Sequence, residues 1–218
     1  MKNVFYFLGL LLMSITSVNA QEKVKDLFQA SETQITWLGI DFSKVKLIGQ
    51  FSQFADIGTK SAANMKLEFF PEWNSMIIRE PSKYDVKGMI KKERIEYNTK
   101  WVTENNKKTP TEDLEAVNLP EYSKEFIQEH IKEQRYGISN GLGILFFVEY
   151  LNKTTEIAKI HFIAVDMDSR DIILHDTMES KPGGIGIKNY WAKSFSNTIS
   201  LINSERYFIW KDEILEEK

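Results

Sequence analysis

The chain has 218 residues, with 28 lysines and arginines against 31 aspartates and glutamates, and it contains no cysteine. The missing cysteine excludes disulfides, thiolate metal sites and a cysteine nucleophile. The charges nearly balance and the basic residues form no stripe along the sequence, so we expect no nucleic-acid partner.

The first twenty residues have the pattern of a secretory signal peptide. Lys2 precedes an apolar run over 4–13, and Ala20 is the small residue that suits cleavage. A membrane anchor is the alternative, but the run is short for a bilayer and no stop-transfer pattern follows. We expect cleavage after Ala20, which removes Lys2 and changes the net charge from −3 to −4.

The expected mature protein, 21–218, is periplasmic or secreted. A disulfide-free exported chain suits a bacterial periplasm, and there is no cysteine to carry a lipid anchor. No later segment is apolar for long enough to span a membrane, so we expect no transmembrane segment after cleavage. The length suits a single α/β domain.

The first half of the mature chain predicts a strand followed by helices. Residues 35–42 alternate as a strand does, and 45–48 adds a short apolar piece. Residues 51–80 favour helix, divided near Pro71. A short helix over 83–92 and a strand at 94–97, which 99–102 could extend, come next. The faces expected for the first strand are Thr36, Leu38, Ile40 and Phe42 on one side and Trp37, Gly39 and Asp41 on the other.

Residues 104–115 are the most loop-like stretch, rich in asparagine, lysine and threonine, and we expect a flexible loop there. Ser123 then has the position of a helix cap. The residues that predict an apolar stripe on that helix are Phe126, Ile127, His130 and Ile131.

The second half predicts a buried strand, a hairpin and a long helix. The continuous apolar run over 143–150 indicates a strand buried on both faces. Residues 157–165 and 171–179 form a hairpin. Pairing Asp166 with Arg170 across its three-residue loop sets the register, which places His161 opposite His175.

The helical stripe runs over 187–202, Asn203 and Ser204 end it, and 207–210 predicts a final strand. The predicted fold class is therefore α/β (α+β): a mixed sheet with helices packed on it, ending in strand, hairpin, helix and strand.

His161 and His175 are the first candidate site, because cross-strand histidines can both ligate zinc or copper. Glu179 shares their face as a third ligand, whereas Asp176 does not, and Lys159 adds a repelling charge. The alternative is a polar, half-exposed sheet face. We favour that alternative and predict no metal and no cofactor.

The glycine-rich loop before the long helix is the second candidate. The free amides of a helix N-terminus can hold an anion, and the candidate residues are Gly183, Gly184, Gly186 and Lys188. The loop matches neither a Walker pattern nor a dinucleotide fingerprint, so a simple chain turn is the favoured alternative.

Other acidic residues give weaker signals. Asp166, Asp168 and Asp171 lack the spacing of a helix–loop–helix calcium site, and turn formation explains them. Asp41 follows the first strand, as a catalytic acid often does, but no histidine or second carboxylate stands at motif spacing. The familiar hydrolase motifs are also absent, and we predict no catalytic residue.

Two segments resemble known families. Residues 35–43 (ITWLGIDFS), with Trp73–Asn74 and 83–85 downstream, look like an uncharacterised family of secreted bacterial envelope proteins. The tail, with 165–173 (VDMDSRDII), Pro-Gly-Gly and 189–192 (NYWA), is similar to periplasmic lipoprotein domains around the curli-secretion lipoprotein and the amino-terminal domain of TolB. The second resemblance implies an α/β sandwich for envelope assembly and protein–protein contact, without an active site.

Two functional hypotheses follow. The first is a non-enzymatic binding or envelope-assembly module whose partner is another envelope protein, docked on the strand expected at 207–210. The alternative is a secreted enzyme or small-ligand-binding protein that uses the Gly183–Gly186 loop, Asp41 or the His161/His175 pair.

Overall fold

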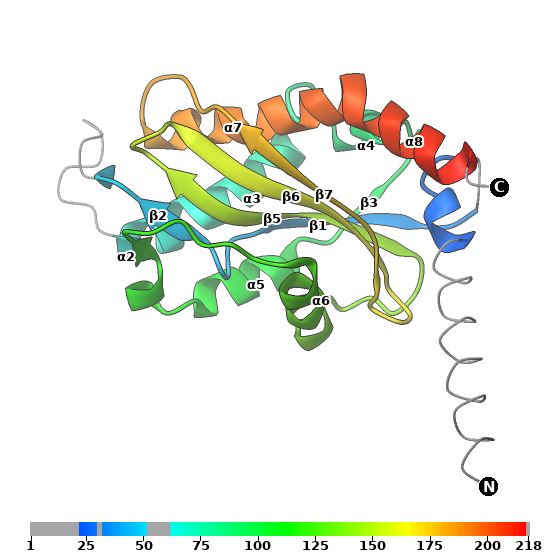
Figure 1. The fold of residues 1–218 in the computed structure, drawn as a ribbon, viewed down its shortest axis with the longest axis horizontal. Helices are drawn as coiled ribbons and strands as arrows, with labels where there is room; N and C mark the ends of the chain where they lie inside the picture. Colours follow the sequence, from blue (N-terminus) through cyan, green and yellow to red (C-terminus); the bar gives the residue numbers. More distant parts are fainter. Residues whose placement is uncertain (1–21, 30–31, 52–61, 217–218) are drawn as a thin grey trace, which may run out of the picture.

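The computed structural model describes residues 22–29, 32–51 and 62–216, so the expected signal peptide lies outside the described residues. Within them, the chain forms a curled, mostly parallel mixed sheet with helices packed against it (Figure 1), which confirms the α/β prediction. The strands are β1 (Ile35–Asp41), β2 (Lys46–Ile48), β3 (Glu96–Tyr97), β4 (Glu115–Ala116), β5 (Leu142–Asn152), β6 (Ile157–Asp166) and β7 (Ile172–Ser180).

Strand β5 is the centre of the sheet. Along one side it pairs with β6 in an antiparallel ladder, and β7 pairs with β6 in turn. Its other side is shared by two short parallel strands, β1 along the first half and β2 along the last three residues. β3 and β4 lie outside β1 and β2, again parallel. Every residue of β5 is buried, as its apolar run predicts.

The helices divide between the two faces of the sheet. We call one the α7 face, covered by α3, α4, α7 and α8, and the other the α6 face (Figure 1). The helical elements are α2 (Ala62–Asn64), the π-helical η2 (Met65–Phe69), α3 (Phe70–Arg79), α4 (Val86–Met89), α5 (Lys100–Lys108), the 3₁₀ turn η3 (Thr111–Asp113), α6 (Lys124–Glu133), α7 (Ile187–Leu201), the π-helical η4 (Ile202–Arg206) and α8 (Tyr207–Glu216).

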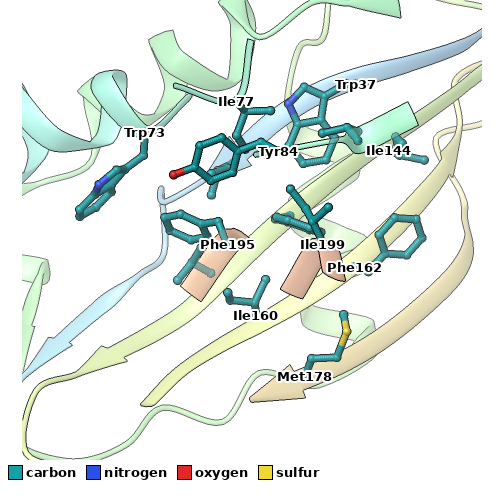
Figure 2. Close-up of a cluster of buried hydrophobic side chains, with 14 of the residues drawn as sticks. Trp37, Trp73, Ile77, Tyr84, Ile144, Ile160, Phe162, Met178, Phe195 and Ile199 are labelled. Atoms are coloured by element: carbon teal, nitrogen blue, oxygen red, sulfur yellow. The ribbon is translucent and has the colours of Figure 1, made fainter. Parts of the chain in front are cut away.

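The larger core lies on the α7 face and is rich in aromatic rings. Phe42 stacks on Phe70 with ring centroids 4.3 Å apart, and Phe195 meets Phe42 edge-on. Burial of such rings is the main source of stability in a sheet–helix core. Figure 2 shows side chains of α3 and α7 directed at the sheet, namely Trp73, Ile77, Phe195 and Ile199 against Ile144, Ile160 and Phe162.

The smaller core lies on the α6 face. Ile127 and Ile131 of α6 and Val102 of α5 pack against side chains from β1, β5 and β6. Helix α6 begins as predicted, because the Ser123 hydroxyl accepts the Phe126 N–H at 3.2 Å. The apolar stripe is narrower than expected, since Phe126 is exposed.

The alternation predicted for β1 is wrong after Trp37. A β-bulge shifts the register between Trp37 and Gly39, so Leu38 joins the α6 face while Ile40 and Phe42 join the α7 face. Gly39 has a φ of 114°, and a Cβ there would lie 2.5 Å from Asn74 Oδ1. Only glycine permits this approach of helix α3 to the strand.

The predicted hairpin register is wrong by two residues. His161 stands opposite Thr177, while His175 stands opposite Ile163. The amide of Asp166 donates to the carbonyl of Asp171 at 3.0 Å, and the Arg170 N–H donates to the Asp166 carbonyl at 2.7 Å within the turn. Because a shift of two residues preserves the alternation of a strand, the side chains over 174–180 keep their predicted faces. A bulge between Ala164 and Val165 moves Ile172 to the α6 face, away from the face of Ala164 on which it was expected.

The predicted final strand at 207–210 is wrong, because α7 continues through η4 into α8. Tyr207 and Trp210 are buried while Phe208 and Ile209 are exposed, which is helical spacing. Ser204 does not end the helix, because its hydroxyl donates to the Ser200 carbonyl one turn earlier at 2.8 Å.

The stretch 104–115, predicted as a loop, is largely regular. It contains the second half of α5, the turn η3 and the first residue of β4. The strand expected to extend over 99–102 is instead the start of α5. The division expected near Pro71 is confirmed, because the π-helical η2 ends at Phe69 and Pro71 lies in the first turn of α3, where its missing N–H has little cost.

Candidate functional site

The α6 face carries a row of polar groups that includes all three histidines of the chain, of which His130 and His161 are buried and His175 is half-buried. The cross-strand register aligns Asp41 of β1 with Phe147 of β5, then His161 of β6, then Thr177 of β7. The Phe147 ring meets the rings of both His130 and His161 edge-on. It therefore separates two polar clusters, one on each side.

The first cluster forms where β1 ends. Asp41 Oδ2 lies 2.9 Å from His130 Nε2 of α6, and Asp41 Oδ1 accepts the Ser43 N–H at 2.8 Å. The two side chains are 1% and 2% exposed. Burial alone would raise the pKa of Asp41, but the bonds from His130 and Ser43 outweigh it and leave this pKa below its ordinary value.

The geometry around Ser43 differs from that of a catalytic triad. Ser43 Oγ lies 3.1 Å from His130 Nε2, the same nitrogen that Asp41 contacts. In a triad the acid holds Nδ1 so that Nε2 can take the serine proton. Here Nδ1 faces the side-chain amide of Gln134 at 3.3 Å. The cluster ties α6 to the end of β1, and it has no activated nucleophile.

A pocket of about 210 Å³ opens beside this cluster, and we call it the β1-end pocket. Sequence reasoning singles out Asp41 but misses His130, which lies 89 positions away on a helix stripe predicted to be apolar. Burial of a histidine on such a stripe is the only signal that could have suggested it. The pocket is lined by Ser43, Lys44, Asn105, Lys108, Thr109, Pro110, His130 and Gln134.

The second cluster contains the predicted histidine pair. His161 Nδ1 and His175 Nε2 lie 2.8 Å apart, although their strands pair differently from the prediction. The pair is a diagonal neighbour contact, and the Thr177 hydroxyl also lies 2.9 Å from His161 Nδ1. The two nitrogens thus face each other directly. Among the described residues, no group of three or more His, Cys, Asp or Glu side chains could hold a metal ion.

Glu149 is the member of this cluster that the sequence did not reveal. Its carboxylate is fully buried, 2.7 Å from His161 Nε2 and 3.1 Å from Lys159 Nζ. Burial raises its pKa, but the bonds to His161 and Lys159 lower it more, so the net pKa is below its ordinary value. Burial, with the nearby His161, lowers the pKa of His175 to about 4.

The two carboxylates considered as further metal ligands have other roles. Glu179 accepts the Tyr150 hydroxyl at 3.3 Å. Asp176 faces the α7 side, as its position in the strand predicts, and accepts bonds from Arg206 at 2.6 Å and Trp210 at 2.9 Å. Asp176 thereby fixes the last helix to β7.

The glycine-rich loop leads into α7 through two left-handed residues, Gly184 with φ of 102° and Gly186 with φ of 77°. Gly183 and Gly184 line a separate hollow of about 350 Å³ that also includes Lys83 and Lys193. Lys188 lies apart from that hollow, 3.8 Å from Glu72. The structure therefore brings together only part of the candidate anion site, and anion binding there stays a prediction.

The aspartate-rich turn is held by lysines. Asp166 accepts a bond from Lys23 at 2.7 Å, and Lys23 also bonds Asp168 at 2.9 Å. Asp171 lies 2.9 Å from Lys132 of α6. These ion pairs attach the N-terminal segment and α6 to the hairpin turn.

The two sides of the sheet end differently. On the outer side of β1, along the part of the strand that β3 does not cover, the side chains of Asn74 and Asn106 take the place of a neighbouring strand. We call this part of β1 the sealed edge. Asn74 both donates to the Ile40 carbonyl (3.0 Å) and accepts its N–H (2.7 Å). Asn106 donates to the same carbonyl (2.9 Å) and accepts the Phe42 N–H (2.7 Å).

On the other side, β7 pairs with β6 alone among the described residues, and we call its outer side the open edge. Gln128 of α6 closes its first position, accepting the Ile172 N–H at 2.7 Å and donating to the Arg170 carbonyl. Thr177 and Glu179 are exposed further along. An unpaired strand edge is a template for another strand.

In the described part of the chain, no helix is both long and apolar enough to cross a membrane. Comparisons with models of known protein families and with curated proteins give no match to this sequence.

Proposed function

We propose that the chain is an exported, non-enzymatic binding module of the bacterial cell envelope that joins another envelope protein by strand addition along β7. The single observation that carries this proposal is the open edge, because a nine-residue strand with one free side can pair with an extended segment. The partner's backbone would supply the ladder that β7 lacks on that side.

The middle of the open edge has the right backbone orientation. The Thr177 N–H donates to the Asp176 carboxylate at 2.8 Å, which indicates that the Thr177 backbone faces away from β6. Backbone direction alternates along an antiparallel strand, so His175 and Glu179 share this outward direction. Three consecutive outward positions are enough for a short added strand.

The open edge is also rigid. Its partner β6 is buried from Ile160 to Asp166, and β5 behind it is buried throughout. The last residue of β7 is attached to helix α7, because the Ser180 hydroxyl donates to the Ser194 carbonyl at 2.8 Å. A preformed edge lowers the entropy lost when a flexible segment binds.

The charge of the edge favours a basic partner segment. Glu179 is an exposed carboxylate of β7, which contains no lysine or arginine, whereas Asp176 is already paired with Arg206 on the α7 side. Cross-strand pairs of opposite charge stabilise a ladder by about 0.2–1 kcal/mol each. We therefore propose an extended segment with a lysine or arginine opposite Glu179 as the occupant.

Export is part of the same proposal. The first twenty residues support it through their basic start, apolar run and small final residue. Amino-terminal sequencing of protein isolated from producer cells should begin at Gln21. Sequencing that begins at Met1 would remove the envelope from the proposal.

The partner can be sought with a photo-crosslinking residue at Glu179 in producer cells, with the same residue at Lys107, an exposed position of α5, as the control. Crosslinking to another envelope protein from Glu179 alone is the expected result. Thr177→Pro should abolish the crosslink because it removes the outward N–H. Thr177→Val should keep the crosslink, since it loses the hydroxyl but retains the N–H.

Three outcomes would contradict the proposal. A crosslink of the chain to itself would make the open edge a contact between copies. Equal crosslinking from Glu179 and Lys107 would show no preference for the edge. A crosslink that survives Thr177→Pro would mean that the partner contacts side chains near Glu179 without forming a ladder.

A further inference from the structure

The β1-end pocket has a chemistry that strand addition does not use. Its lining includes the half-buried Ser43 and the buried His130, together with the exposed Lys44 and Lys108. We propose that this pocket binds a small oxyanion, with a carboxylate or phosphate group directed at Asn105 and Ser43. The site is independent of the open edge of β7.

The first argument is an unsatisfied donor. Asn105 Nδ2 is buried at the pocket and has no hydrogen-bond partner among the described residues. Buried side-chain amides nearly always find an acceptor, so such a group indicates a missing one. The side-chain amide of the neighbouring Asn106 is hydrogen-bonded through both its oxygen and its nitrogen, so α5 is not misplaced as a whole.

The second argument is the balance of charge. No residue that lines the pocket carries a carboxylate. Asp41, which lies behind it, is already engaged by His130 and by the Ser43 N–H. Lys44 and Lys108 have no ion-pair partner in the described part of the chain, whereas the adjacent Lys107 bonds Glu104 at 2.9 Å. Donors and cations without acceptors fit an anion.

The third argument is that the pocket is preformed. The Tyr122 hydroxyl donates to the Lys44 carbonyl at 2.8 Å, and Lys66 donates to the Thr109 carbonyl at 2.8 Å. The Thr109 hydroxyl reaches the Ser43 carbonyl at 3.3 Å and joins the two walls. A volume of about 210 Å³ suits a phosphate or a short carboxylate better than a nucleotide or an oligosaccharide.

The test is titration of the purified chain with inorganic phosphate and, separately, with acetate, using acetamide as the uncharged analogue of acetate. We expect saturable heat for at least one anion, with a Kd of about 1 mM or tighter, and none for acetamide. The anion that binds more tightly shows whether the site prefers a phosphate or a carboxylate. Added salt should weaken binding, since the lysines are on an exposed rim.

Variants locate the site. Asn105→Ala should weaken anion binding about tenfold, because it removes a donor to a charged acceptor. Lys108→Gln should weaken binding about threefold, and the matched control Lys107→Gln should leave it unchanged. Thermal denaturation of each variant checks that the fold is retained.

Several results would overturn the proposal. These are no heat with either anion up to about 50 mM, well above the expected Kd, equal binding of acetamide and acetate, and full binding by Asn105→Ala. Amide chemical shifts that move only around Gly183 and Lys193 would also overturn it, because they would place the anion at the glycine-rich loop.

Discussion

The sealed edge of β1 and the open edge of β7 solve the same problem in opposite ways. At both, a strand has a side without a full-length neighbouring strand. At β1, two helices each contribute a buried asparagine that bonds the backbone of Ile40 or Phe42. At β7, the helix side chain of Gln128 accepts the N–H of Ile172, and among the described residues no helix side chain covers the strand edge further along.

The difference teaches where interaction is available. An amide side chain offers one donor and one acceptor, the same groups that a strand residue offers, so it can replace a strand one residue at a time. Asn74 and Asn106 do this and leave nothing for another chain to pair with. Over 175–179 the open edge has no such amide from a described helix, only the Asp176 carboxylate of the strand itself, which accepts the Thr177 N–H, and this contrast is the basis of the proposed function.

The largest expected effect comes from breaking the sealed edge. Asn106→Ala should lower the free energy of unfolding by about 2–3 kcal/mol, because it leaves the buried Phe42 N–H without a partner. Asn105→Ala, one position earlier on α5, should cost less than about 1 kcal/mol. Urea denaturation of both variants measures the difference. Equal losses would show that α5 packing, rather than backbone pairing, explains the result.

The next-largest effect is a pH dependence of stability that comes from His175 in β7. The folded pKa of His175 is about 4, below the ordinary 6.5, so the unfolded state binds a proton first as pH falls. Stability should therefore fall between pH 6.5 and 4, by about 1 kcal/mol after allowing for the solvent exposure of the ring. His175→Gln should flatten this interval in urea denaturation measured across pH.

Asp41 and Glu149 titrate in a different window and with their own sign. Their folded pKa values lie below the ordinary 3.8 and 4.5, so the stability that they contribute is present above those values and lost at lower pH. A loss that stays between pH 6.5 and 4 in His175→Gln would contradict the assignment of that interval to His175.

Replacing Thr177 by proline should have a smaller effect on stability and a large effect on strand pairing with the partner. Thr177→Pro should lower the free energy of unfolding by about 1 kcal/mol, because the N–H that it removes faces away from β6. Urea denaturation beside Thr177→Val separates this loss from that of the hydroxyl bond to His161. A loss of several kcal/mol would mean that the Thr177 N–H belongs to the β6 ladder.

The smallest effect is expected at Phe208. Its ring is 49% exposed on α8, so Phe208→Lys should change the free energy of unfolding by no more than about 0.5 kcal/mol. Crosslinking from Glu179 should also be unchanged, because α8 is not the strand edge first expected there. Loss of the crosslink would move the docking surface to α8.

Local pattern was enough to predict much of the fold. The continuous apolar run gave β5, period-two alternation gave β6, and the serine cap gave α6, because each depends on neighbouring residues. The apolar run at Tyr207 failed because four residues fit strand and helix equally well. The alternation of β1 failed because the bulge at Gly39 depends on Asn74, which is distant in sequence.

The candidate site was less predictable for the same physical reason. His161 and His175 were found together because a hairpin makes their contact local. Asp41 and His130 come from segments 89 positions apart, and their contact depends on how α6 crosses the sheet. Asn105 and Asn106 are adjacent and chemically identical, yet one bonds β1 and the other lines a pocket.

The division of one side of β5 between β1 and β2 has a consequence for the order of folding. The β5–β6–β7 meander connects neighbours through short turns, whereas Ile35 finds its β5 partner only at Leu142. Closing that long loop costs entropy before the pairing is gained, so the meander should assemble first and act as the template for β1 and β2. A chain that emerges from its amino terminus would therefore present β1 without a full partner until β5 has followed.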